Sequence, residues 1–228
     1  MKHRVLIPDV EHQSDMTVQE HIYRRLRSAL VLGHFSPGKP VTIRGLATAL
    51  ETSPTPVREA LRRLSSENGL TMLPNRRIVV PNMTPERFRE LILLRISLEC
   101  HAALRALPYV NDVLVDAITE VDNRINDAIT RGDRDQQINE NQQFHRMIFS
   151  ANPDAVAMPM IESIWLQLGP FNRIAAQHID ELYKVDHHRE AIAALRIRDE
   201  DALKAALEAD IRGGVGDLDP ESIRKILG

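Results

Sequence analysis

The sequence has a single cysteine, Cys100, among its 228 residues. That count excludes an intrachain disulfide and any zinc site built from several cysteines. Because Cys100 lies among apolar residues, we expect a buried and unreactive thiol. Long apolar runs are also missing, since none approaches the roughly 18 residues that span a membrane. Pro8 interrupts the short run Val5–Ile7, so no signal peptide is predicted, and we expect a cytoplasmic protein.

Recurrent catalytic motifs are absent as well. The sequence contains no His-Glu-x-x-His, no glutamate three residues before any of its nine histidines, and no glycine-rich phosphate loop. These absences argue against an enzyme. One alternative stays open, a metal-dependent enzyme of the helical-bundle type with an accessory DNA-binding-like domain. It depends entirely on the polar residues described below.

Charge is distributed unevenly along the chain. Residues 1–82 hold 12 Lys and Arg against 7 Asp and Glu, a net charge of +5. Residues 83–228 hold 17 against 25, a net charge of −8, and the two parts sum to the overall −3. A basic first part on an acidic body is typical of a protein that binds nucleic acid through one end only.

The stretch SPTPVREALRRL, from Ser53 to Leu64, predicts a short amphipathic helix. Ser53 and Thr55 are residues that favour helix caps, and Pro56 suits a first helical turn. The apolar residues recur at the i, i+3, i+4, i+7 spacing of one buried face, and they are Val57, Ala60, Leu61 and Leu64. Arg58, Arg62 and Arg63 lie off that face. Such a helix suits a DNA major groove, and a solvated surface helix is the alternative.

The flanking chain favours the DNA-binding interpretation. Thr42 can cap a preceding helix that carries Leu46, Ala47 and Leu50, and a linker of a few residues joins the two helices as in a helix-turn-helix. Two β-rich runs then follow, Leu70–Leu73 and Ile78–Pro81, around the basic turn Pro74–Arg77. They predict a wing hairpin beside the recognition helix.

The remainder of the chain reads as helical. Six helices are expected, at Glu86–Leu107, Val110–Arg131, Asp133–Ser150, Ala155–Gln177, Asp186–Ile197 and Glu200–Arg212, with a possible kink at Gly169-Pro170. The fold class is therefore mainly α, a winged helix-turn-helix domain followed by an antiparallel helical bundle. The predicted parts are an N-terminal arm (1–16), the winged domain (17–82), the bundle (83–213) and a C-terminal extension with a short helix (214–228).

Four polar residues lie on apolar faces of the predicted bundle helices. Asn141 and His145 are one turn apart on one helix, and His188 and Asp210 lie on two others. Polar groups in an apolar face need a partner, an ion or water, and helical bundles build metal sites from such residues. The sequence leaves two interpretations open, a bound metal and a hydrogen-bonded network without metal.

The chain resembles the GntR-type winged helix-turn-helix transcription regulators. The resemblance rests on Gly33, on Ser36-Pro37-Gly38, and above all on the hexad PVREAL, Pro56–Leu61. It is strong over Val18–Pro81 and continues more weakly to about Ile211, as the all-helical FCD effector domain of the FadR subfamily. It implies a ligand-responsive homodimeric regulator, more often a repressor, that binds a pseudo-palindromic site in double-stranded DNA.

The resemblance also implies roles for single residues in DNA binding. Arg58 is expected to contact guanine, whereas Arg44, Ser53 and Thr55 match positions that mainly grip phosphate. Further contacts are expected from Arg62 on the helix and from Arg76 and Arg77 at the wing tip.

In the effector domain, many members bind zinc or nickel through Asp-x-x-x-His, a later histidine, and another histidine 22 residues further on. Here Asn141 stands in place of the aspartate, His145 and His188 match, and Asp210 replaces the last histidine. Two histidines, a carboxylate and an amide oxygen can still hold a divalent metal. Arg95 and Gln142 are the predicted contacts for a small carboxylate effector. An Arg95–Glu99 pair at i, i+4 is the alternative role for that arginine.

Overall fold

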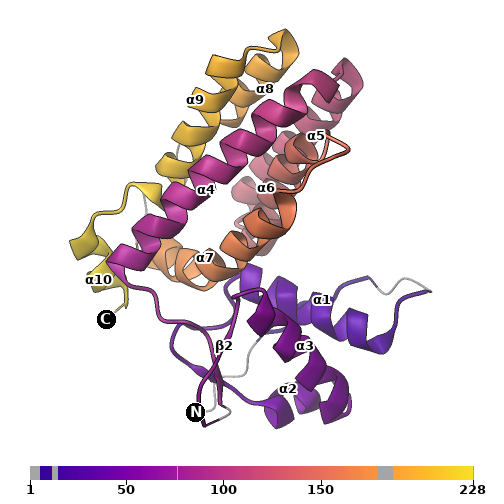
Figure 1. The fold of residues 1–228 in the computed structure, drawn as a ribbon, viewed down its shortest axis with the longest axis vertical. Coiled ribbons are helices and arrows are strands. Elements are labelled where there is room, and N and C mark those ends of the chain that lie inside the picture. The colour runs from indigo at the N-terminus through magenta and orange to yellow at the C-terminus, as the bar shows by residue number, and fades with distance from the viewer. Residues whose placement is uncertain (1–5, 12–14, 76, 179–186, 228) are drawn as a thin grey trace. The chain divides into compact units, whose positions relative to one another are not determined.

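The computed structural model describes residues 6–11, 15–75, 77–178 and 187–227. The chain forms two compact units (Figure 1). One comprises Met1–Pro85 with Ser163–His178 and Ile223–Gly228, and the other Glu86–Glu162 with Ile179–Ser222. The mainly α fold class predicted from the sequence is confirmed. In the described residues, no helix combines the length and the apolar character needed to cross a membrane.

The first unit contains a three-helix winged domain. Its helices are α1 (Val18–Val31), α2 (Ile43–Ala49) and α3 (Pro54–Ser66). The predicted cap of α2 is present, because the Thr42 hydroxyl accepts from the backbone N–H of Gly45, and the Thr17 hydroxyl caps α1 by accepting from that of Glu20. Helix α3 packs against both α1 and α2. This packing sets the position of the predicted recognition helix.

Helix α3 has the predicted cap residue Ser53 and ends two residues beyond the predicted stretch. It begins at Pro54, so Pro54 takes the first helical position, and Ser53 is the N-cap without a side-chain hydrogen bond. At the other end Asn68, just after the C-cap residue Glu67, adopts the left-handed conformation at φ +64°. The predicted apolar face is buried in full, at Val57, Ala60, Leu61 and Leu64.

The wing is a small antiparallel sheet in the order β1-β3-β2. Its strands are β1 (Pro40–Val41), β2 (Thr71–Met72) and β3 (Ile78–Val79). Val79 pairs with both Pro40 and Thr71, and Ile78 pairs with both Val41 and Met72. The hairpin of β2 and β3 was predicted, whereas the two-residue strand β1 was not.

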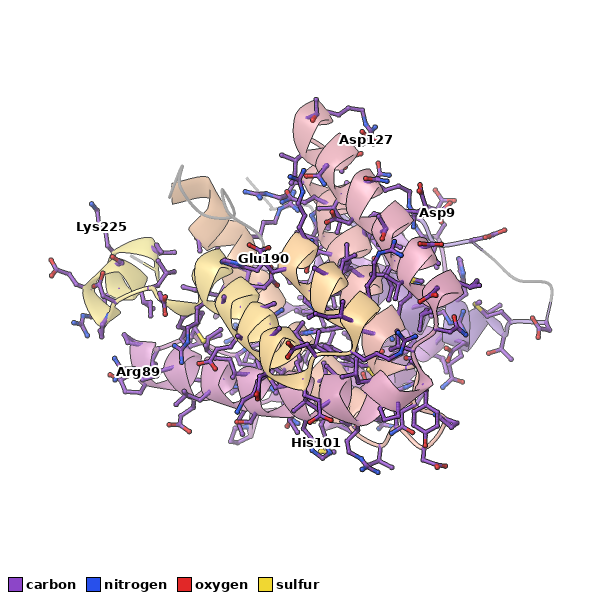
Figure 2. All side chains as sticks on the ribbon, turned by 90° about the horizontal axis from the view of Figure 1, so that it is seen from above. Asp9, Arg89, His101, Asp127, Glu190 and Lys225 are labelled. Carbon is purple, nitrogen blue, oxygen red and sulfur yellow. The ribbon has the colours of Figure 1, made fainter. Side chains whose placement is uncertain are left out.

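The second unit is a helical bundle. It contains α4 (Pro85–Ala106), the 3₁₀ turn η1 (Leu107–Tyr109), α5 (Asp112–Arg131), α6 (Arg134–Phe149), α8 (His188–Ile197), α9 (Glu200–Ile211) and the π-helical segment η2 (Arg212–Gly216). Helix α5 packs against α6 and α8, and α8 packs against α9. Phe88, Ile118, Phe144, Ile148 and Leu203 are fully buried in this unit. Polar side chains such as His101 on α4 and Asp127 on α5 project outward (Figure 2).

Two elements complete the chain, α7 (Met158–His178) and α10 (Pro220–Leu227). Helix α7 runs as one helix through Pro170, where the sequence suggested a kink. The glycine-rich segment between α9 and α10 forms the π-helical η2. The predicted beginning of a helix at Asp186 lies outside the described residues.

Candidate DNA interface and candidate metal centre

The three arginines on the outer side of α3 have different surroundings. Arg62 pairs with Glu59 at 3.0 Å. Arg63 is held by several groups of its own domain. Arg58 is exposed and makes no hydrogen bond or ion pair among the residues that the structure describes. An exposed, uncommitted guanidinium is the one best able to meet a base edge.

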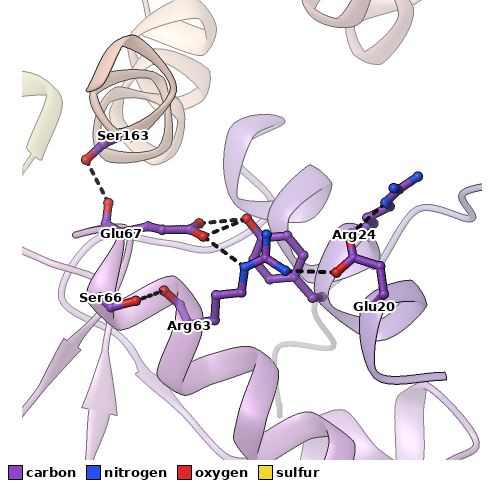
Figure 3. Close-up of polar contacts among 7 residues, drawn as sticks. Glu20, Arg24, Arg63, Ser66, Glu67 and Ser163 are labelled. Atoms are coloured by element: carbon purple, nitrogen blue, oxygen red, sulfur yellow. Dashed lines mark hydrogen bonds and ion pairs between the residues drawn. The ribbon is translucent and has the colours of Figure 1, made fainter. Parts of the chain in front are cut away.

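Arg63 lies at the centre of a polar network (Figure 3). Its guanidinium contacts Glu20 at 2.8 Å and Glu67 at 3.1 Å, and its Cζ lies 3.5 Å from the ring centroid of Tyr23. The Tyr23 hydroxyl donates to both carboxylate oxygens of Glu67, at 2.9 and 2.7 Å. This network joins α1 to the end of α3, so Arg63 stabilises the domain that presents Arg58.

The network reaches α7 at Ser163. The Ser163 hydroxyl donates to the backbone carbonyl of Glu67 at 2.7 Å, and the Asn68 side chain lies 3.4 Å from the same hydroxyl. Arg173 on the same helix donates to the carbonyl of Leu32, at the end of α1. The second part of α7 therefore belongs structurally to the winged unit.

The other predicted DNA contacts lie on the surface. The exposed residues are Arg44, Ser53, Thr55 and Arg77. No partner is recorded within the described chain for the Arg44 and Arg77 guanidinium groups. Arg76 lies outside the described residues. The surface that could meet DNA is therefore basic and accessible.

In the bundle, three of the four predicted metal ligands converge. One donor atom from each of His145, His188 and Asp210 lies within 4.8 Å of the others. They come from α6, α8 and α9, and both imidazole side chains are 1% exposed. Nε2 of His145 is 3.2 Å from Oδ2 of Asp210, and Nε2 of His188 is 3.6 Å from Oδ1 of the same carboxylate.

Asn141, the fourth predicted ligand, contacts the same cluster. Its Nδ2 lies 3.2 Å from Nε2 of His188. Gln142 is half-buried on the same helix and makes no hydrogen bond to the cluster within the described residues. Nε of Arg95 binds Oε1 of Glu99 at 2.8 Å, as the i, i+4 alternative predicted. Arg95 also acts on the cluster electrostatically, because its charge favours the ionised form of Asp210.

Two carboxylates at this site were not predicted from the sequence. Oδ1 of Asp122 lies 2.9 Å from Nδ1 of His188, and Oε2 of Glu99 lies 4.0 Å from Nδ1 of His145. Asp122 follows the spacing of the buried apolar face of α5, between Ile118 and Ile125. An aspartate in such a face is the same signal that identified Asp210.

Two titrating groups of the bundle are shifted by their surroundings. Burial alone would raise the pKa of Asp210. The hydrogen bond and charge of His145 and the charges of His188 and Arg95 have the larger effect, and together they hold the pKa of that carboxyl well below its usual range. Burial raises the pKa of the Cys100 thiol to about 11, which fits the predicted unreactive thiol. Asp210 is therefore ready as an anionic ligand at neutral pH.

The donor set fits a divalent metal of the zinc or nickel type. Two imidazole nitrogens and a carboxylate oxygen are common ligands of such ions. Both ring nitrogens of His145 are buried; Nδ1 makes no hydrogen bond in the described chain, and Nε2 faces the Asp210 carboxylate at 3.2 Å. A cation beside the ionised Asp210 would satisfy these atoms together.

Two family models match the chain. Residues 18–80 match the model of the bacterial regulatory proteins of the gntR family, and residues 90–213 match the FCD domain. The chain is 27% identical to the HTH-type transcriptional regulator McbR of Escherichia coli K12 over 204 residues, 88% of this chain and 92% of that protein. It is 26% identical to the transcriptional repressor RspR of the same strain, over 87% of this chain and 88% of that protein.

A solved structure is similar to this chain over most of its length. That of E. coli McbR/YncC covers 86% of this chain and 94% of its own, with a TM-score of 0.79 and 27% identity. The FCD match alone spans more than half of the sequence, and the gntR match covers the winged domain with α3 and the wing. The chain therefore belongs to the GntR family of bacterial transcription regulators, with a winged helix-turn-helix domain and an FCD effector-binding domain.

Proposed function

We propose that this regulator binds a pseudo-palindromic operator as a homodimer and acts as a repressor whose FCD domain senses a small carboxylate through a bound divalent metal. The single observation that carries the metal part is the convergence of His145, His188 and Asp210 in the buried bundle. A carboxylate effector can complete the coordination of such an ion, because three protein ligands leave a position open. Arg95 supplies a nearby positive charge.

The DNA-binding part is supported by the charge and the surface of the winged unit. Arg58 lies exposed on α3, and Arg44 and Arg77 add exposed basic groups on the same unit. We propose that Arg58 contacts base edges and that the other two, with Ser53 and Thr55, contact the backbone. Two copies related by a two-fold axis would read two half-sites.

Two alternatives predict different behaviour. A metal-free hydrogen-bonded network is supported by the Asn141–His188 contact, which satisfies the imidazole without an ion. A metal-dependent enzyme would use the same cluster, but the curated relatives to which the chain is similar are named as transcriptional regulators. The regulator hypothesis is therefore favoured over the enzyme hypothesis.

Elemental analysis separates the metal-bound site from the metal-free network. Full-length protein is incubated with Zn²⁺ or Ni²⁺, passed through a desalting column and measured for metal per chain. We expect close to one ion per wild-type chain, and a large loss in the double variant His145→Ala, His188→Ala. His187→Ala is the matched control, because the His187 ring lies beside Glu190 rather than in the cluster. A wild-type protein that retains no ion after loading would exclude the metal hypothesis.

Sedimentation and footprinting test the remaining parts. The proposal predicts a dimer by analytical ultracentrifugation and a protected site with two-fold symmetry on duplexes selected from a random library. A monomer, or protection of an asymmetric single half-site, would contradict it.

A further inference from the structure

Asp122 is a buried aspartate that the proposed ligand set does not include. It lies on α5 within a face formed by Val115, Ile118, Val121 and Ile125, and the residue is 5% exposed. A carboxylate in such surroundings is costly unless it is paired and hydrogen-bonded. The contacts of Asp122 therefore indicate its role.

Its main partner is the imidazole of His188. Oδ1 of Asp122 lies 2.9 Å from Nδ1 of His188, and Oδ2 lies 3.5 Å from Nδ2 of Asn126. The ring of His188 is stacked on Phe144, with centroids 4.0 Å apart and planes 24° apart. Phe144 thus fixes the plane of the imidazole, and Asp122 fixes its rotation within that plane.

The hydrogen-bonding partners of His188 select one tautomer. A carboxylate can only accept, so Nδ1 of the neutral ring must carry the proton that Asp122 receives. Nε2 then keeps its lone pair, and it accepts the amide N–H of Asn141 at 3.2 Å. The same nitrogen is the one that faces Asp210. The contacts with Asp122 and Asn141 both agree with a lone pair on Nε2, directed at the proposed metal position.

The second histidine lacks this arrangement. Nδ1 of His145 is 4.0 Å from Oε2 of Glu99, beyond hydrogen-bonding distance, and it makes no hydrogen bond within the described residues. The two imidazoles of the cluster are therefore unequal, because His188 has a close carboxylate at Nδ1, whereas the close carboxylate of His145 is Asp210 at Nε2.

We infer that Asp122 is a positioning residue of this site, which holds His188 with its proton on Nδ1 so that Nε2 is available to a divalent cation. The inference rests on the proposed metal function for its purpose. The tautomer of His188 itself does not depend on a metal, so it can be tested in the metal-free protein. A hydrogen-bonded carboxylate behind a ligating histidine also raises the basicity of the ligand.

The first experiment measures the tautomer without metal. Full-length, chelator-treated protein with ¹⁵N-labelled histidine is examined by long-range ¹H–¹⁵N correlation at a pH where imidazoles are neutral, and His188 is assigned from a His188→Gln variant. The wild type is expected to show Nδ1 protonated. In Asp122→Asn and Asp122→Leu the proton should move to Nε2, because Asp210 becomes the carboxylate within reach. Nδ1 protonation that persists in both variants would overturn the inference.

The second experiment measures Zn²⁺ affinity by competition with a chromophoric chelator. Asp122→Asn should bind about 10- to 100-fold more weakly than the wild type, as is typical when such an outer carboxylate is lost. Asp116→Asn is the matched control, since it removes the same charge from α5 at an exposed ion pair with Arg196. Circular dichroism checks that each variant is folded.

The outcomes separate the inference from the proposed function. A wild type that binds no Zn²⁺ but shows the expected tautomer shift would reject the metal function and keep the positioning role of Asp122. A wild type that binds Zn²⁺ with an affinity unchanged in Asp122→Asn would reject the inference and keep the metal function.

Discussion

The hydroxyl of Ser163 donates a hydrogen bond to the backbone carbonyl of Glu67, 2.7 Å away, at the residue that caps the recognition helix. The last carbonyls of a helix have no partner within it, so a group from another element must satisfy them when they are buried. Here α7 supplies that group, and the Glu67 side chain simultaneously binds Tyr23 and Arg63 (Figure 3). The end of α3 is therefore held by two helices at one residue.

Ser163→Ala should lower the stability of the winged unit by about 1 kcal/mol, the usual contribution of a hydrogen bond of this kind. Denaturant unfolding can be followed by fluorescence of Trp165, the single tryptophan, which is buried two residues along the same helix. Ser66→Ala is the control, because it removes an exposed bond to the carbonyl of Arg63 within α3 itself. Equal midpoints for the two variants would show that the Ser163 bond contributes nothing.

Gly169→Ala should destabilise the same unit, although alanine normally favours a helix interior by about 1 kcal/mol over glycine. A Cβ at this position of α7 would lie 2.5 Å from the carbonyl oxygen of Val31 and 2.6 Å from that of Leu30. Because these are backbone atoms, α1 and α7 must separate, at a cost of about 1–3 kcal/mol.

The same fluorescence measurement tests this prediction. Gly132→Ala is the comparison, because a Cβ there meets no atom within 4 Å and only the positive φ of +68° opposes it. A Gly169→Ala protein with a raised unfolding midpoint would mean that helix propensity outweighs the contact with α1.

Arg58→Ala should weaken binding to a selected operator by about 1–3 kcal/mol, or roughly 5- to 150-fold, while changing binding to scrambled duplex much less. Arg58 is the arginine of α3 with no partner in the described chain, so its removal should leave the fold intact. Arg63→Ala is the contrasting variant, because it removes contacts to Glu20, Glu67 and Tyr23. It should lower thermal stability and preserve sequence discrimination in the folded protein. Footprints that are identical for wild type and Arg58→Ala would contradict the assignment.

The Tyr23 phenol should lose its proton at a higher pH than an ordinary tyrosine. Burial, together with its hydrogen bond to Glu67 and the charge of that carboxylate, raises the pKa of Tyr23 from 10.0 to about 12. A raised folded-state pKa favours folding while the phenol is protonated, so this contribution is complete below pH 10 and is lost as pH rises toward 12. The difference in ultraviolet absorbance between wild type and Tyr23→Phe isolates this phenol, and a midpoint near pH 10 would contradict the burial argument.

Sequence patterns predicted the local structure well because it depends on neighbouring residues. The apolar spacing of α3, the cap at Thr42 and the short α10 were all visible in the sequence. Helical spacing also indicated that His145, His188 and Asp210 share the bundle interior, where the structure brings them together. Their role as metal ligands stays a proposal.

Features that depend on distant contacts were not predictable in this way. Arg58 and Arg63 both lie off the apolar face of the predicted helix, so the sequence does not distinguish them. Arg63 contacts Glu20 and Tyr23 because α1 packs against α3. The second part of α7 packs with the winged unit through bonds from Ser163 and Arg173 that connect residues 96 and 141 positions apart. Strand β1 has two residues and exists because β3 pairs with it. Asp122 carried the right local signal, yet its partner is 66 residues away.

Asn141→Asp should raise the affinity for Zn²⁺ and lower the stability of the metal-free protein. The amide of Asn141 now donates to the lone pair of His188 Nε2, and so takes the place of a cation at that atom. A carboxylate there has no proton to donate, and it adds a second negative charge beside Asp210, so the metal-free site is disfavoured. A bound cation gains an anionic ligand from the same substitution, and roughly tenfold tighter binding is expected from the added ligand charge.

Chelator competition measures the Zn²⁺ affinity of Asn141→Asp, and thermal melting with and without Zn²⁺ measures the stabilities of the metal-bound and metal-free forms. Gln143→Glu is the control, because it adds the same charge to an exposed position of α6. If Asn141→Asp bound Zn²⁺ no more tightly than Gln143→Glu, the amide could not be the group that competes with the metal at His188.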